Sequence, residues 1–339
     1  MKKLPVEQTI GLPLAHDLTE VTPACRRKRV AFSRGHVVRM EDIVQLRRLG
    51  KNQLYVGMVE PGFVHEDDAA LLLAPHLAGE GIEHDLYPTE GKVNFRTTVA
   101  GLFRVDIEAL ARLNRLGVPS MPTIHDRFPV APGKTVAAFR IIPLCCERTL
   151  VERMLSIAER PLIWVEAYRI KQAAIVVTGT EVYSGVVEDR FVDRLSFKLR
   201  QLGVEPVFTT VVPDDSRKVT AAIEHAASVA RLVLVTGGTS VDPDDVTNQA
   251  MADAGVTFVS RGNPLQPGNH LSIGHRDDRI FCTVPAAALH FNATALDVFL
   301  PRLLVEDLPD ADELAQAGHG GLCHFCEPCV YPVCPFGRP

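Results

Sequence analysis

Four cysteines near the C-terminal end of the chain have a spacing that could bind a metal. Cys323, Cys326, Cys329 and Cys334 form the pattern C-x2-C-x2-C-x4-C. Thiolates this close together are typical of one metal centre, and the compact C-x2-C-x2-C run favours a 4Fe-4S cluster over zinc. Reduced thiols or disulfides are the alternative, although disulfides are rare in proteins that are not exported. The sequence therefore predicts one metal centre in this segment.

Glycines and carboxylates follow two apolar stretches of the chain. TGTE at 178–181 follows AAIVV, and TGG at 236–238 follows RLVLV, with further acids over the next seven residues. Glycine lets a ligand approach the backbone, whose free N–H groups can hold an anion. Carboxylates are ligands that Mg²⁺ prefers. The pattern indicates a phosphorylated ligand bound with Mg²⁺; the alternative is that acids such as Asp189 and Asp214 only cap helices.

The elements that would position these loops alternate between strand and helix. Strands are expected at 172–178, 204–212, 231–236, 270–274 and 279–285, and helices at 188–202, 214–230, 246–255 and 286–304. Such alternation is typical of an α/β domain with a largely parallel sheet. Ligands of these sheets bind beyond the carboxyl ends of the strands, where both glycine loops would lie.

The rest of the chain forms two further regions. Residues 1–171 combine short strands with helices near 41–49, 66–78, 107–116 and 147–159, which indicates an N-terminal α+β region. Residues 306–339 are rich in Gly, Pro and Cys and cannot build a core of their own, so a metal would organise this tail. We expect three parts: 1–171, the α/β domain at 172–305, and the tail at 306–339.

Composition and missing motifs exclude several classes of protein. The 339 residues carry a net charge of −5, which disfavours nucleic-acid binding. There is no apolar run of about 18 residues to span a membrane. The start MKKLPVEQTI lacks the apolar region of a signal peptide, so we expect a cytoplasmic protein. PGKT at 132–135 is not a P-loop, because Phe128 stands where the motif needs glycine.

Five segments together resemble a known family. TGTEVYSGVVEDRF, VVPDD, VTGGTSVDPDDVT, NPLQPGNHLSIG and VPAAA are similar, in order and spacing, to the signatures of the molybdopterin-binding domain. This domain is shared by proteins that adenylylate molybdopterin and proteins that insert molybdenum into it. The N-terminal half resembles the molybdenum-insertion branch, molybdopterin molybdenumtransferase, more loosely. The resemblance implies a three-layer α/β/α fold and binding of molybdopterin or its adenylate.

The resemblance also implies roles for particular residues. Those implied to serve Mg²⁺ and the reaction are Glu181, Asp214 or Asp215, and Asp245. Those implied to contact the cofactor are Thr178, Gly179, Thr236, Gly237, Gly238, Ser240, Asp242, Pro267, Gly268 and Pro285.

The sequence departs from the family pattern at two ligand loops. Gln266 and Asn269 stand where insertion proteins usually have lysines, and a neutral amide cannot neutralise molybdate or phosphate. The usual P-G-N-P turn reads Pro-Ala-Ala-Ala at 285–288. These changes leave the binding scaffold in place and alter the part that would perform insertion.

Two functions follow from these features. The first is an enzyme of molybdenum cofactor biosynthesis that hydrolyses adenylyl-molybdopterin with Mg²⁺ and inserts molybdate or tungstate. The alternative is a carrier or chaperone that delivers the pterin cofactor to a client molybdoenzyme or tungstoenzyme, with a redox or structural metal centre in the tail. A homodimer is expected from the family, and neither nucleic acid nor a membrane is an expected partner.

Overall fold

The computed structural model describes residues 1–22, 27–89, 91–237 and 246–338. The chain forms two compact units. Unit 1 comprises residues 1–98, 105–126 and 132–164, and unit 2 comprises residues 99–104, 127–131 and 165–339. Both units are therefore discontinuous in sequence.

Unit 2 is built on a six-stranded sheet of order β15-β14-β16-β19-β18-β17. The strands are β14 (Gln172–Thr178), β15 (Glu205–Val212), β16 (Leu232–Thr236), β17 (Thr257–Ser260), β18 (Ile273–Arg276) and β19 (Arg279–Val284). β15, β14, β16 and β19 are parallel, while β18 and β17 run antiparallel at one edge. The expected α/β class with a mostly parallel sheet is confirmed, and β17 is a strand that the sequence did not predict.

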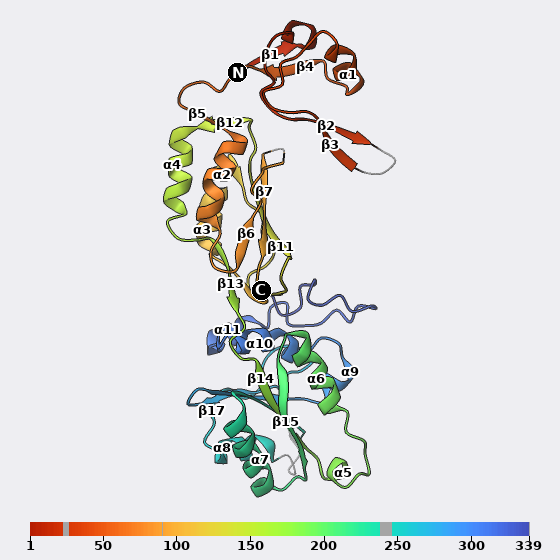
Figure 1. Cartoon of the computed structure of the whole chain (residues 1–339). Coiled ribbons are helices and arrows are strands. Elements are labelled where there is room, and N and C mark those ends of the chain that lie inside the picture. The colour runs from red at the N-terminus through yellow and green to blue at the C-terminus, as the bar shows by residue number, and fades with distance from the viewer. Residues whose placement is uncertain (23–26, 90, 238–245, 339) are drawn as a thin grey trace. The chain divides into compact units, whose positions relative to one another are not determined.

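Alternate residues of the central strands enter two separate cores, and this makes three layers (Figure 1). Ile175 and Val177 of β14 pack with α6 (Phe191–Gln201) and α10 (Ala295–Leu304). Ala174 and Val176 face the other way and pack with α7 (Ser216–Val229) and α8 (Thr247–Asp253). Because a strand directs successive side chains to opposite faces, a strand buried on both faces reads as one apolar run.

Carboxylates fix where the main helices of unit 2 begin. Asp215 accepts a hydrogen bond from the Lys218 N–H at the start of α7. Asp189 accepts from the backbone N–H groups of residues 191 and 192 at the start of α6. Thr294 and Asp297 form a capping box on α10. These acids satisfy N–H groups that have no partner within the helix.

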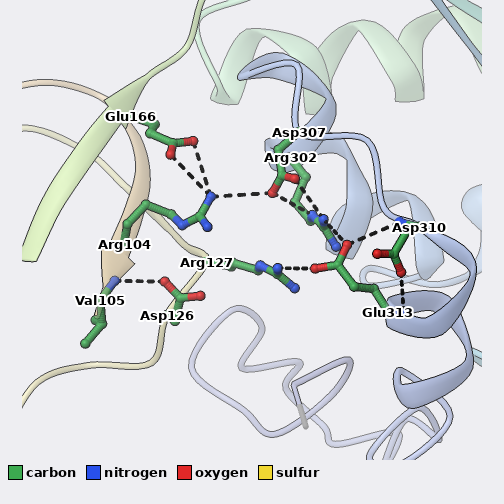
Figure 2. Close-up of polar contacts among 9 residues, drawn as sticks. All are labelled: Arg104, Val105, Asp126, Arg127, Glu166, Arg302, Asp307, Asp310 and Glu313. Carbon is green, nitrogen blue, oxygen red and sulfur yellow. Dashed lines mark hydrogen bonds and ion pairs between the residues drawn. The ribbon is translucent and has the colours of Figure 1, made fainter. Parts of the chain in front are cut away.

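A network of ion pairs joins the short strands of unit 2 to its last helices (Figure 2). Strands β10 (Phe128–Val130), β8 (Gly101–Val105) and β13 (Ile163–Ala167) form a three-stranded sheet. Arg104 of β8 lies 3.3 Å from Glu166 of β13 and 3.5 Å from Asp307. Arg302 of α10 binds both Asp307 and Glu313, and Arg127 also pairs with Glu313 of α11 (Ala311–Gln316).

The C-terminal segment is part of unit 2 and is organised by packing. Phe336 is 1% exposed within the same core as α10, and the Tyr331 hydroxyl donates to the Asp297 carbonyl at 2.7 Å. The Gly337 N–H donates to the Gly320 carbonyl at 3.0 Å and closes residues 320–337 into a loop. The expectation that a metal organises this tail needs correction, because apolar contacts with the α/β core already hold it.

Unit 1 is an α+β assembly, as expected. Its helices are α1 (Asp42–Arg48), α2 (Glu66–Leu77), α3 (Ile107–Asn114) and α4 (Arg148–Ile157), with a 3-10 helix at Val6–Thr9. Its strands include β1 (Lys2–Pro5), β2 (Leu18–Thr22), β3 (Arg27–Phe32), β4 (Gln53–Val56), β5 (Phe63–His65), β6 (Ile82–His84), β7 (Lys92–Thr97), β9 (Pro119–Ser120), β11 (Thr135–Ile141) and β12 (Cys145–Glu147). Within the described part of the chain, no helix has the length and apolar character to cross a bilayer.

Candidate functional site

The loops singled out from sequence meet at one edge of the unit 2 sheet. Register pairs Thr178 with Val212, Val177 with Thr236, and Thr236 with Val284. The carboxyl ends of four parallel strands therefore lie side by side. Loop 178–181, the start of the TGG loop and Pro285 all follow these ends, where ligands of such sheets bind.

Gly237 lies close to the backbone at the end of β14. A Cβ at this position would lie 2.1 Å from the Thr178 carbonyl oxygen, and the φ angle is +90°. The Thr247 hydroxyl donates to the Gly237 carbonyl at 2.6 Å and lies 3.4 Å from the Thr178 hydroxyl. Only glycine satisfies both the space and the backbone conformation here.

Asp214 and Asp215 have separate structural contacts. Asp214 accepts from the Thr180 N–H at 2.8 Å and lies 3.2 Å from the Thr180 hydroxyl, which joins the β15 end to loop 178–181. Asp215 caps α7 at a distance of 3.0 Å from the Lys218 nitrogen. Hence the capping alternative applies to Asp215, while Asp214 holds the first glycine loop in place.

Glu181 differs from these two acids because its carboxylate is exposed and makes no polar contact among the described residues. In the described ranges, no three His, Cys, Asp or Glu side chains form a group that could hold a metal, and the Mg²⁺ set implied by the resemblance stays a prediction. Four implied residues, Gly238, Ser240, Asp242 and Asp245, lie outside the described residues.

Two buried polar atoms that flank the TGG loop have no hydrogen-bond partner among the described residues. Thr236 Oγ1, at the end of β16, and Asn248 Oδ1, in the first turn of α8, make no hydrogen bond among the described residues. Thr236 itself is fully buried. A buried polar atom left unpaired costs about 1–3 kcal/mol, so these atoms are poised for a hydrogen-bonding ligand or water.

The loop before β18 lies at the same edge and contains both buried and exposed residues. Pro267 and Gly268 are buried, and the Pro267 carbonyl accepts from the Ala295 N–H at 3.0 Å, so both pack against the start of α10. Gln266 and Asn269 are exposed. Of these four residues, the polar pair is therefore the one available to a ligand.

A cavity of about 660 Å³ is lined by α6, by the three residues that precede it and by α9 (Ala287–His290). Its lining residues are Glu188, Asp189, Arg190, Asp193, Arg194, Phe197, Leu289 and His290. Arg194 donates to the carbonyls of Ala288 and Phe291 and to the Asn292 side chain, at 3.3, 3.1 and 2.9 Å. No local sequence pattern identifies Arg194, because its partners lie nearly a hundred residues away along the chain.

The four C-terminal cysteines are free thiols. Cys323 and Cys334 are half-buried against the core of unit 2, whereas Cys326 and Cys329 are exposed. The Phe325 N–H donates to Cys323 Sγ at 3.3 Å. Among the residues that the structure describes, no three of these sulfurs form a ligand group, so the metal centre stays a prediction.

Comparison with known families covers two parts of the chain. Residues 174–304 match the model of a family described as a probable molybdopterin binding domain. Residues 3–58 match a domain of unknown function. The first match coincides with the α/β part of unit 2 and its carboxyl-edge loops.

The curated relatives match only part of this chain. A protein of Levilactobacillus brevis, named as a putative competence-damage inducible protein, is 30% identical over 115 residues, and the match covers 30% of this chain and 28% of that protein. The chain spans between 19% and 28% of the length of the first curated relatives that it matches.

Two solved structures are among those similar to this chain. MoaB from Pyrococcus furiosus, a tungsten cofactor synthesizing protein, covers 40% of this chain and 94% of its own, with 19% identity and a TM-score of 0.33. The moea molybdopterin biosynthesis protein from Pyrococcus horikosii covers 91% of this chain and 75% of its own, with 15% identity and a TM-score of 0.35. At these values neither structure carries an argument about the site.

Proposed function

We propose, because residues 174–304 match the model of a probable molybdopterin binding domain, that unit 2 binds molybdopterin or its adenylate at the carboxyl edge of its sheet. The chain would then act in molybdenum cofactor biosynthesis or in a related step that handles the cofactor. The pterin is the small-molecule partner in either case, and molybdate or tungstate is the metal substrate.

The unpaired Thr236 hydroxyl carries this proposal. It is buried, it makes no hydrogen bond within the described residues, and it stands at the start of the glycine loop. Pterin rings and phosphates present many donors and acceptors that could satisfy it and Asn248 Oδ1. Gly237, which leaves no room for a side chain, would let such a ligand approach the backbone.

The cavity beside α6 would hold the charged end of the ligand. Arg190 and Arg194 can pair with phosphate oxygens, and Phe197 offers an apolar face. Glu188 and Asp193 line the same space, so the cavity is not uniformly cationic. This mixture suits a ligand that carries both a phosphate and hydrogen-bond donors.

Two activities are compatible with pterin binding. An insertion enzyme needs Mg²⁺, and Glu181 is the implied carboxylate that remains without a partner in the described part of the site. A cofactor carrier needs no such chemistry. The exposed Gln266 and Asn269 favour the carrier. They stand where insertion proteins usually have lysines, and a neutral amide cannot neutralise molybdate. A client enzyme and a homodimer are further proposals of this kind.

The test is a binding and a hydrolysis measurement on anaerobically purified protein. Calorimetry with molybdopterin and with adenylyl-molybdopterin should detect binding of at least one of them. An enzyme should release AMP in the presence of Mg²⁺, and Glu181→Gln or Asp245→Asn should abolish release while sparing binding. Glu224→Gln, an exposed acid on α7, is the matched control. Binding without AMP release supports the carrier, and no binding of either form rejects the proposal.

A further inference from the structure

The cysteine loop, residues 320–337, is held at both ends but free in the middle. Gly320 and Gly337 close its base, and Phe336 and Tyr331 anchor it to the core of unit 2. Between these anchors the loop forms no helix or strand. A loop fixed in this way has already lost much of the conformational freedom that a ligand would otherwise have to restrict.

The four thiols differ in burial, and within the described residues they do not form a ligand group. Cys323 and Cys334 are near the two fixed ends and are half-buried, while Cys326 and Cys329 lie on the free part and are exposed. No disulfide joins any of these four. Exposed side chains have few packing contacts to lose, so drawing them inward toward the other two costs little core packing.

One backbone contact already has the form found around metal-bound thiolates. The Phe325 N–H donates to Cys323 Sγ at 3.3 Å, with Phe325 in the left-handed region at φ +53°. Hydrogen bonds from backbone N–H groups to sulfur stabilise the negative charge of a thiolate ligand. The turn from Cys323 to Cys326 is therefore partly preorganised for a thiolate at Cys323.

We propose that the cysteine loop binds one thiophilic metal centre through Cys323, Cys326, Cys329 and Cys334, and that this centre stiffens an edge of the pterin site. The four thiols would release their protons to solvent as the metal binds. A single zinc ion and an iron–sulfur cluster share this ligand chemistry, and the experiment distinguishes them. Metal binding itself does not depend on the proposed function, whereas its effect on the pterin site does.

The loop contacts that site at two places. The Cys323 N–H donates to the Gln266 carbonyl and the Gln266 N–H donates to the Gly321 carbonyl, both at 2.8 Å. The Phe325 ring lies 5.6 Å, centre to centre, from that of Phe291, whose carbonyl accepts from the cavity residue Arg194. A metal that orders the loop would therefore also restrain Gln266 and Phe291.

The first test measures metal in the full chain purified without oxygen. Metal analysis as isolated, zinc titration against a chromophoric chelator, and reconstitution with Fe²⁺ and sulfide should yield one zinc ion or one cluster per chain. Cys326→Ser and Cys329→Ser should lose that metal without a change in the far-ultraviolet circular dichroism spectrum, because both side chains are exposed. Cys145→Ser removes a half-buried thiol of unit 1 and should keep it.

Three outcomes would overturn the metal site. They are failure of the wild-type chain to retain zinc or a cluster, full metal content in the Cys326→Ser/Cys329→Ser double variant, and a Cys326–Cys329 disulfide in the anaerobic protein. Retention by Cys334→Ser alone would remove that residue from the ligand set and require a substitute such as His324.

The second test measures hydrogen exchange with no pterin present. Metal should slow exchange of the Gln266 and Cys323 amides in the wild-type chain and leave both unchanged in the double variant. If metal binds but neither amide responds, the coupling to the pterin site is wrong while the metal centre stands. Failure of pterin to bind would leave both of these measurements unaffected.

Discussion

At the scale of single residues, two buried threonines of unit 2 differ in the hydrogen bonding of their hydroxyl groups. The Thr283 hydroxyl accepts from the Ser272 N–H at 2.7 Å and lies 3.3 Å from the His270 carbonyl. The Thr236 hydroxyl has no such partner among the described residues. Because valine has the same shape without the polar atom, the pair compares a hydroxyl that is hydrogen-bonded within the fold with one that we propose binds the ligand.

We predict that Thr236→Val stabilises the ligand-free protein, by about 1 kcal/mol, since it removes an unpaired buried polar atom. Thr283→Val should destabilise it by about 1–3 kcal/mol, because the Ser272 N–H is left without its acceptor. Urea denaturation measures both changes. Pterin affinity should fall in Thr236→Val, and a variant that loses stability but binds pterin normally would show that Thr236 is a structural residue.

Gly237 supports a second prediction. Alanine there would bring its Cβ to 2.1 Å from the Thr178 carbonyl and would also keep a positive φ. Gly203→Ala is the control, since Gly203 has φ +73° but nothing within 4 Å of an added Cβ. The control should cost about 1–2 kcal/mol from backbone strain alone. Gly237→Ala should cost more and should abolish pterin binding; equal losses in the two variants would contradict the close approach.

At the scale of elements, α11 depends on charge for its position. Partial burial alone would raise the pKa of Glu313, but hydrogen bonds from Arg302 and Arg127 outweigh it and lower that pKa from 4.5 to about 2. A carboxylate whose pKa is lower in the folded state stabilises the fold above its unfolded pKa. That contribution is lost as the pH falls from about 4.5 toward 2.

We predict that Glu313→Gln lowers the stability of unit 2 at neutral pH and flattens its decline over this acid range. Neutral glutamine keeps the shape but cannot pair with two guanidinium groups. Denaturant midpoints measured at several pH values test this. Asp312→Asn, an exposed neighbour on the same helix, should retain the wild-type slope. If the denaturant midpoint of Glu313→Gln falls with decreasing pH as steeply as that of the wild type, protonation of Glu313 does not cause the loss of stability in this range.

The same scale shows which elements could be predicted from sequence. α7 was predictable because an N-cap aspartate precedes a regular apolar spacing, and β14 because an apolar run ends at a glycine. β17 was not predicted because it has only four residues. α11 was not predicted, although Asp310 and Glu313 form a capping box, because it has only six residues and lies in a segment rich in Gly, Pro and Cys. The burial of Phe336 could not be predicted, because its neighbours come from distant parts of the chain.

The candidate site was predictable only where its signals are local. Glycines and acids that directly follow strands identified the carboxyl edge. Arg194 and the cavity beside it depend on α6 meeting α9, which is a tertiary event without a local pattern. The separate roles of Asp214 and Asp215 likewise follow from one hydrogen bond to Thr180 that spacing does not reveal.

At the scale of the whole molecule, unit 2 includes two short segments that precede its main segment, residues 165–339. Residues 99–104 and 127–131 belong to it, although they are flanked on both sides by unit 1. Leu102 is fully buried in the same core as Tyr168, Ile170 and α10. A boundary near residue 171, drawn from the alternation of strands and helices, cannot detect such segments because their own pattern is that of ordinary short strands.

We therefore predict that a fragment of residues 172–339 is less stable than unit 2 in the full chain. It lacks Leu102, Tyr168 and Ile170 from its core and the Arg104 and Arg127 partners of Asp307 and Glu313. Loss of one buried leucine side chain alone typically costs about 2–5 kcal/mol.

Leu102→Ala in the full chain should reproduce part of the effect, and Leu72→Ala, at an exposed position of unit 1, should not. Denaturation followed by circular dichroism compares them. If the fragment unfolds at the same denaturant concentration as unit 2 of the full chain, the two inserted segments contribute nothing to that core, and the α/β domain is an independent folding unit.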